Sequence, residues 1–147
     1  MANKSINKLS QGNIQQLYRY LFHYTKDYAN CYGKFNWTDF TIIDFCQRNK
    51  IIHKGRRNKV YTSSFFWFEA NKPKKAKEND VAHHFLRHIR NAIAHANVRK
   101  ERRKNNSYII VDDYDKNGNQ SMHGEIKEDL FFQFLEIVIK TLKTSKI

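Results

Sequence analysis

The residue types that could act on a phosphodiester gather on one predicted helix, which spans residues 80–97. At 100° per residue, one side of this helix carries a line of polar residues, here called the polar stripe: His84, His88, Asn91 and His95. Arg87 lies beside the stripe and Arg90 lies further round the helix. Histidine exchanges protons near neutral pH and arginine binds phosphate through a planar fork, and phosphodiester cleavage requires both functions. A solvated helix face without function is the alternative interpretation.

Metal binding is a competing interpretation of the same histidines. His84 and His88 have the one-turn spacing that zinc accepts. The helix has no acidic residue after Asp80, however, and no nearby cysteine completes a tetrahedron. The surrounding positive charge would also repel a cation. We therefore expect no metal site and no cofactor.

The net charge of +13 is concentrated in the middle of the chain. Residues 48–106 contain 17 Lys/Arg and 4 Asp/Glu, a net of +13, whereas the rest of the chain contains 10 of each. A localised excess of this size predicts a polyanionic partner, either a nucleic acid or an anionic membrane surface. No helix combines a Lys-rich face with exposed bulky apolar residues, which argues against the membrane.

Two basic segments and two residues of the polar helix are the candidates for contact with a nucleic-acid backbone. They are Arg56 and Arg57 in the first segment, Arg99, Arg102, Arg103 and Lys104 in the second, and Arg87 and His88 in the helix. Phosphate contacts of this kind fix position rather than sequence. Each basic segment is otherwise an ordinary solvated loop.

The chain carries no pattern typical of export or membrane insertion. Its first residues are polar, without the apolar core of a signal peptide, and no run of 18 apolar residues exists. Cys31 and Cys46 make neither a disulfide framework nor a zinc site. We therefore expect a reducing compartment, the cytoplasm, and no membrane partner.

The first half of the chain reads as helices followed by irregular segments. Apolar residues at three- and four-residue steps predict a helix from Ile14 to near Gly33, and Thr38 is predicted to cap a second, shorter helix. The segments that follow are predicted as a basic loop or loose hairpin at 50–61, a buried aromatic run at 65–68 and a solvated connector at 72–77.

In the second half, Asp80 is predicted to cap the polar helix and Glu128 to begin the last helix. Between them, residues 108–111 and 121–126 are predicted as two strands that turn at Asn117-Gly118. The expected fold is mainly all-α: a small up-and-down helical bundle with one β-hairpin between the last two helices. We expect a single domain over residues 1–147, with residues 1–11 flexible.

The run Arg90-Asn91-Ala92-Ile93-Ala94-His95 resembles the Arg-x4-6-His motif of HEPN-domain proteins, including the polar residue that often follows the arginine. The wider run from His88 to Asn97 is similar to bacterial HEPN nucleases. The order of motif helix, basic segment, hairpin and terminal helix also resembles that family. The resemblance implies an all-helical domain that dimerises along the motif helices. It also implies a metal-independent endoribonuclease, although other members bind nucleotides or have lost activity.

Under this hypothesis His95 and its symmetry mate move protons between the 2′-hydroxyl and the leaving 5′-oxygen, while Arg90 stabilises the charge on phosphorus. Asn91 orients His95 or holds the phosphate. Arg90 and His95 lie about 140° apart on an ideal helix, which favours a composite site made by two protomers, although a kink in the helix is the alternative. The resemblance places such an enzyme in toxin–antitoxin or phage-defence systems, with an antitoxin or regulatory partner. The alternatives are a non-catalytic module that binds RNA or nucleotides, and a DNA-binding regulator.

Overall fold

The computed structural model describes residues 9–31, 34–57, 59–69 and 80–142. The helices within these ranges are α1 (Gln11–His23), continued by the π-helical turn η2 (Tyr24–Tyr28), α2 (Phe40–Arg48), α3 (Val81–Ala94) and α4 (Glu128–Lys140). The strands are β1 (Ile51–Ile52), β2 (Ser64–Phe68), β3 (Val98–Arg103), β4 (Asn106–Tyr114) and β5 (Gln120–Lys127). The strands form one sheet in the order β1-β2-β5-β4-β3.

The prediction of a mainly all-α bundle is wrong, because the protein is mixed α/β with a five-stranded sheet. The predicted β4–β5 hairpin is present but forms only the middle of that sheet. Strand β3 was hidden in the second basic segment, where five of six residues are charged. An edge strand needs few apolar residues, and β3 buries only Val98 completely. Likewise, the aromatic run at 65–68 is buried as predicted, apart from the half-buried Phe68, but it forms strand β2.

Several predicted boundaries are confirmed. The Asp80 side chain accepts a hydrogen bond from the backbone N–H of His83 at 3.0 Å and so caps α3. Gly118 has a φ of +83°, the left-handed conformation that the predicted hairpin turn requires. The second helix is capped by Asp39 rather than by Thr38. The predicted connector at 72–77 and most of the predicted flexible segment at 1–11 lie outside the described residues.

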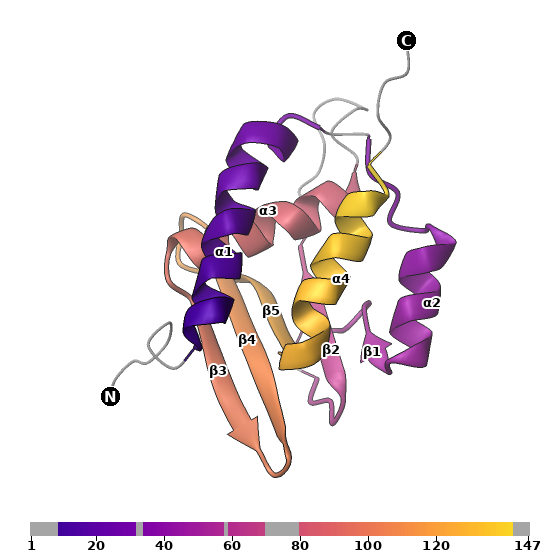
Figure 1. Ribbon diagram of the computed structural model, residues 1–147, viewed down its shortest axis with the longest axis vertical. Helices are drawn as coiled ribbons and strands as arrows, with labels where there is room; N and C mark the ends of the chain where they lie inside the picture. Colours follow the sequence, from indigo (N-terminus) through magenta and orange to yellow (C-terminus); the bar gives the residue numbers. More distant parts are fainter. Residues whose placement is uncertain (1–8, 32–33, 58, 70–79, 143–147) are drawn as a thin grey trace.

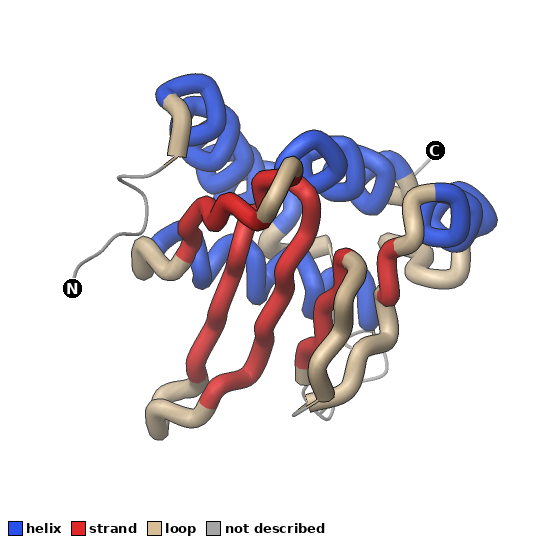
Figure 2. The backbone as a smooth tube through the Cα atoms, turned by 90° about the horizontal axis from the view of Figure 1, so that it is seen from below, coloured by secondary structure: helices blue, strands red, loops and turns tan. Residues whose placement is uncertain are grey.

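The helices cover one face of the sheet. Figure 1 shows α1 and α4 in front of the strands, and Figure 2 shows helices above the strands when the molecule is seen from below. The core on this face is aromatic: the ring of Phe85 on α3 lies 4.8 Å from Phe66 on β2 and 5.5 Å from Phe134 on α4. No helix in the described part of the chain is long and apolar enough to cross a membrane.

The opposite face of the sheet carries a second, smaller buried layer. Phe65 and Trp67 of β2 and Tyr108 and Ile110 of β4 are buried, yet they lie outside the main apolar core. Side chains of the segment between β1 and β2 cover part of this layer, because the ring of Tyr61 packs 4.7 Å from Phe65. The sheet therefore has a helix-covered face and a face covered by loop and charged side chains.

Candidate functional site

Helix α3 ends in a turn that places His95 at its tip. His95 is the C-cap residue, and Ala96 follows it in the left-handed region with a φ of +58°. The N–H of Asn97 donates to the carbonyl of Ala92 at 2.7 Å and that of Ala96 to Ile93 at 3.0 Å, which is the Schellman arrangement. This turn ends α3 directly before β3 and leaves the His95 side chain exposed.

The polar stripe does not form a solvated face. His84 is 4% and His88 is 2% exposed, so both lie inside the protein. The helix angles alone place these histidines opposite the apolar side of the helix, and a solvent-exposed face was one interpretation of that position. Strand β4 and the end of β2 cover this side of α3 instead: His88 Nδ1 lies 2.7 Å from Asp113 Oδ2, and its Nε2 lies 2.7 Å from the carbonyl oxygen of Glu69.

Asp113 ties the predicted catalytic residues of α3 to β4. Its Oδ2 accepts hydrogen bonds from His88 Nδ1 at 2.7 Å and from Asn91 Nδ2 at 3.2 Å. Asn91 Oδ1 in turn accepts from Arg90 Nη1 at 2.9 Å. Burial opposes ionisation of Asp113, but the hydrogen bonds from His88 and Asn91 outweigh it and lower the pKa of the carboxyl. A buried carboxylate therefore holds Asn91, which holds Arg90.

His95 lines a shallow pocket of about 460 Å³ at the end of the sheet. The other lining residues are Asn97, Asp113, Tyr114, Asp115 and Lys116. Among the described residues, Arg90 donates to Asn91 and no side-chain hydrogen bond joins Arg90 to His95. The chain thus presents an exposed imidazole in a pocket and a neighbouring guanidinium that is held on another side of the same helix.

The candidate RNA-binding residues of the second basic segment are spread along β3. Arg99 follows two residues after Asn97, which lines the pocket, and its Nη1 lies 3.5 Å from Asp112 Oδ2. Arg102, Arg103 and Lys104 lie at the other end of the strand, roughly 13 Å or more from Val98 at the usual rise per residue (Figure 1). Arg103 forms ion pairs with Glu101 and Glu125. Arg99 is therefore the member of this segment that the fold brings near His95.

The remaining candidates lie in two places. Arg57 pairs with Glu69 and its guanidinium lies 4.2 Å from the centre of the Trp67 ring, whereas Arg56 is exposed. Arg87 is half-buried on α3, where Nη2 lies 3.3 Å from His84 Nδ1 and 3.4 Å from His88 Nε2. Arg87 and His88 thus belong to the network behind the pocket rather than to its exposed rim.

Four residues that line the pocket escaped the sequence reasoning: Asp113, Tyr114, Asp115 and Lys116. Asp113 had a detectable signal, because it extends the predicted strand 108–111 at a position that points to the same side as Ile109 and Val111. A charged residue at an inward position needs a buried partner, and the polar stripe supplies one. Tyr114, Asp115 and Lys116 had no such signal, because their nearness to His95 depends on how β4 packs against α3.

No cluster of three or more metal-ligating side chains occurs within residues 9–31, 34–57, 59–69 and 80–142. His83 and His88 of α3 hydrogen-bond to carbonyl and carboxylate oxygens of neighbouring elements, and His84 Nδ1 lies 3.3 Å from Arg87 Nη2.

Comparison with known proteins supports the family resemblance. A family model described as HEPN pEK499 p136 matches residues 10–147, which includes the whole motif helix and the sheet. Neither the comparison with curated proteins nor that with solved structures gave a match. Because the family model covers almost the full length, the chain belongs to the HEPN family.

Proposed function

We propose that this HEPN protein is an endoribonuclease, with Arg90, Asn91 and His95 as its site residues. The observation that carries the proposal is the place of His95: it is exposed, and it lines a pocket at the end of the motif helix. The preceding Asn91 and Arg90 are held in position through the buried Asp113. The net charge of +13 suits a polyanionic substrate.

The proposed reaction is attack of the ribose 2′-oxygen on the adjacent phosphorus. His95 of one protomer takes the proton of the 2′-hydroxyl, and the P–O bond to the 5′-oxygen breaks as that oxygen receives a proton from the partner's His95. Arg90 stabilises the charge that develops on the phosphoryl oxygens. The products are a 2′,3′-cyclic phosphate and a 5′-hydroxyl. DNA resists cleavage because it lacks the attacking hydroxyl.

Two protomers are part of the proposal, because within one chain Arg90 hydrogen-bonds to Asn91 and not to His95. In a homodimer formed along α3, the guanidinium of one chain meets the imidazole of the other. Such an enzyme damages its host unless it is restrained, which is why we place it in a toxin–antitoxin or phage-defence setting with a regulatory partner.

Cleavage of labelled RNA in the presence of EDTA tests the proposal. Wild-type protein is expected to cleave and His95→Ala to lose at least 100-fold in rate, the size of effect typical for loss of a general acid–base. His23→Ala is a matched control, because His23 is an exposed helical histidine on α1. Equal cleavage by all three proteins, or none by the wild type, would contradict the nuclease and favour a non-catalytic RNA-binding module.

Expression in a bacterial host tests the setting separately. Wild-type protein should slow growth, and His95→Ala should not. A host that tolerates both proteins equally at matched expression would count against a toxin.

A further inference from the structure

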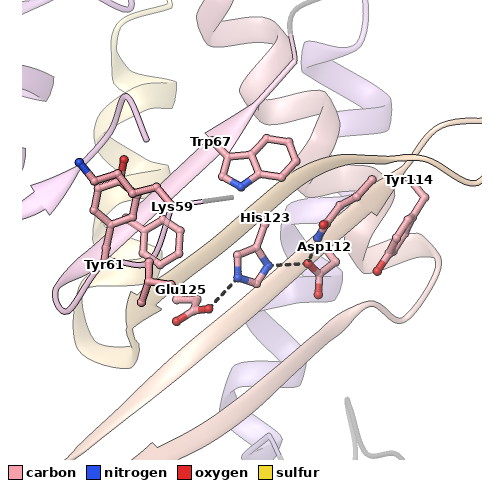
Figure 3. Close-up of a pocket in the computed structure, with 10 residues that line it drawn as sticks. Lys59, Tyr61, Trp67, Asp112, Tyr114, His123 and Glu125 are labelled. Atoms are coloured by element: carbon pink, nitrogen blue, oxygen red, sulfur yellow. Dashed lines mark hydrogen bonds and ion pairs between the residues drawn. The ribbon is translucent and has the colours of Figure 1, made fainter. Parts of the chain in front are cut away.

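A second pocket lies on the loop-covered face of the sheet. Its volume is about 460 Å³, and four aromatic side chains line it: Tyr61, Phe65, Trp67 and Tyr114. Figure 3 shows the polar centre of the pocket, where His123 lies between Asp112 and Glu125, with Tyr61 on the side of Glu125 and Tyr114 on the side of Asp112. The proposed catalytic residues do not belong to this pocket.

Strand register brings the polar centre and the aromatic rings together. Trp67 of β2 pairs with His123 of β5, which pairs with Asp112 of β4, so these three residues form one row across the sheet. In the next row on this face, Phe65 pairs with Glu125. The alternation of strands directs both rows away from the helices.

The segment between β1 and β2 completes one wall. The N–H of Gly55 donates to the carbonyl of Phe66 at 3.0 Å, and a Cβ at position 55 would lie only 2.8 Å from that oxygen. Glycine thus lets this segment approach β2 closely. Arg57 then stacks over Trp67, and the Lys59 ammonium lies 5.5 Å from the centre of the Tyr61 ring. Cations therefore stand beside the aromatic rings of the pocket.

The polar centre is pre-organised. His123 Nδ1 and Nε2 lie 2.6 Å from Asp112 Oδ1 and Glu125 Oε2, and Arg103 donates to Glu125 Oε1 at 2.8 Å. His123 and Arg103 already have carboxylate partners, yet the carboxylate oxygens keep further lone pairs that accept hydrogen bonds. Aromatic rings next to fixed acceptors and cations suit a flat heterocycle that has amino groups and is attached to a phosphate.

Tyr114 connects this pocket with the one around His95. It lies at the end of β4, is 48% exposed, and lines both pockets. An RNA strand with one phosphate at His95 would therefore pass over the side chain of Tyr114 to reach the second pocket. The two pockets form one continuous surface around the end of the sheet.

We propose that the pocket of Tyr61, Trp67, Tyr114 and His123 binds a base of single-stranded RNA next to the nucleotide that is cleaved. The neighbouring site is the one under "Proposed function", but base binding does not require that His95 cleaves. The rings of Tyr61 and Tyr114 supply the stacking surface, and stacking of a base on an aromatic side chain is largely independent of base identity. Arg57 and Lys59 lie beside the rings, where they neutralise the backbone.

Binding is measured on full-length His95→Ala, so that the RNA stays intact, by fluorescence anisotropy with a labelled single-stranded decaribonucleotide. Adding Tyr114→Leu or Tyr61→Leu should weaken binding roughly 5- to 100-fold, as expected for the loss of one stacked base. Tyr114→Phe retains the ring and should bind within twofold. Tyr18→Leu is the matched control, because Tyr18 is 53% exposed on α1 and away from both pockets.

Two indole N–H signals provide an independent readout by NMR. Trp67 borders the pocket, whereas Trp37 packs against Phe66 and Phe134 in the core. Titration with the same RNA should shift the Trp67 signal and leave that of Trp37 in place. This comparison does not depend on any substitution in the pocket and so remains valid if a variant fails to fold.

Three results would overturn the proposal. The first is unchanged RNA binding by both leucine variants. The second is displacement of the RNA by a free mononucleotide that binds as tightly as the strand, which would make the pocket a nucleotide site. The third is a change from dimer to monomer in both leucine variants, which would make this face a protein interface. If the pocket binds RNA as expected but the wild-type protein does not cleave RNA, only the proposed nuclease is contradicted.

Discussion

At the scale of single residues, Asp113 is the buried position on β4 that hydrogen-bonds to the motif helix α3. Its carboxylate accepts from His88 and Asn91 and is almost fully buried. We expect Asp113→Asn to lower the free energy of unfolding at pH 7 by about 2 kcal/mol, because an amide accepts these bonds less strongly and adds a donor. Urea unfolding of the variant against the control Asp44→Asn, whose carboxylate pairs with Arg48 on the surface of α2, measures this difference.

The same residue predicts an acid dependence. The pKa of Asp113 is lowered in the folded state by its hydrogen bonds, against the effect of burial. Its stabilising contribution is therefore present above the unfolded pKa and is lost as the pH falls through the folded value. The difference between wild type and Asp113→Asn should shrink as the pH is lowered below about 4. A difference that stays constant down to pH 2 would contradict this account.

His123 predicts the opposite dependence on the alkaline side. Burial alone would lower the pKa of His123, but the hydrogen bonds to Asp112 and Glu125 raise it to about 9. A raised pKa stabilises the fold fully below the unfolded value of 6.5 and loses that effect as the pH rises through 9. We expect about 2 kcal/mol of stability to be lost across this range, after allowance for partial exposure.

Thermal unfolding from pH 6 to pH 9.5 checks the prediction for His123. In His123→Gln the loss of stability over this interval should largely disappear, whereas His23→Ala should follow the wild type. Parallel curves for wild type and His123→Gln would show that His123 does not titrate in this way.

At the scale of elements, the end of α3 carries a local strain next to His95. Ala96 has a φ of +58°, a conformation that costs an L-residue about 1 kcal/mol and costs glycine very little. We expect Ala96→Gly to raise the free energy of unfolding by about 0.5–1 kcal/mol. Ala94→Gly is the matched control and should destabilise, because Ala94 is the last residue in helical conformation. A Tm that falls in both variants would contradict the argument.

Pairing of the edge strand β3 with β4 determines which of its charged residues find partners. Its six residues carry five charges, which in isolation favour a solvated loop. Antiparallel pairing of Val98 with Val111 through Arg103 with Asn106 aligns these charges with partners on neighbouring strands. Arg103 thereby reaches Glu125 at 2.8 Å and its guanidinium lies 4.8 Å from the centre of the Tyr108 ring. The basic segment is thus split between structural ion pairs and exposed cations.

At the scale of the whole molecule, the proposed composite site predicts complementation between two inactive variants. Arg90→Ala and His95→Ala should each lack RNA cleavage alone. A mixture that has exchanged subunits contains heterodimers that join the Arg90 of one chain to the His95 of the other. Each heterodimer keeps one Arg90 and one His95. We expect such a mixture to recover a small but measurable fraction of wild-type activity, because the remaining His95 takes the proton of the 2′-hydroxyl beside Arg90 while water replaces the missing His95 as the proton donor to the 5′-oxygen.

Light scattering of the same samples shows whether dimers are present, and affinity purification with a tag on one variant shows whether heterodimers have formed. A mixture that forms heterodimers and stays inactive would contradict the composite site and leave a site within one chain. The net charge of +13 per protomer opposes association. Dimer formation should consequently strengthen as salt screens this repulsion, while RNA binding weakens.

The sequence predicted the local features of the fold but not its layers. Asp80 as a cap, the Asn117-Gly118 turn and the start of α4 at Glu128 follow from short-range rules, since capping, left-handed turns and the helix dipole each depend on a few neighbouring residues. The sheet does not. Its central strands pair segments far apart in the chain, such as Phe65 with Glu125, and no local pattern encodes that partnership.

The motif Arg90 to His95, the excess of positive charge and the line of polar residues on one helix were determined by the sequence alone, because residue type and helical spacing suffice to define them. Tertiary structure decided which of those polar residues reach solvent: β4 buries His88 against Asp113 and leaves His95 exposed. It also placed Tyr114 between two pockets on opposite sides of the sheet end. The physical reason is that burial and proximity arise from packing between distant segments, whereas periodicity arises within a single one.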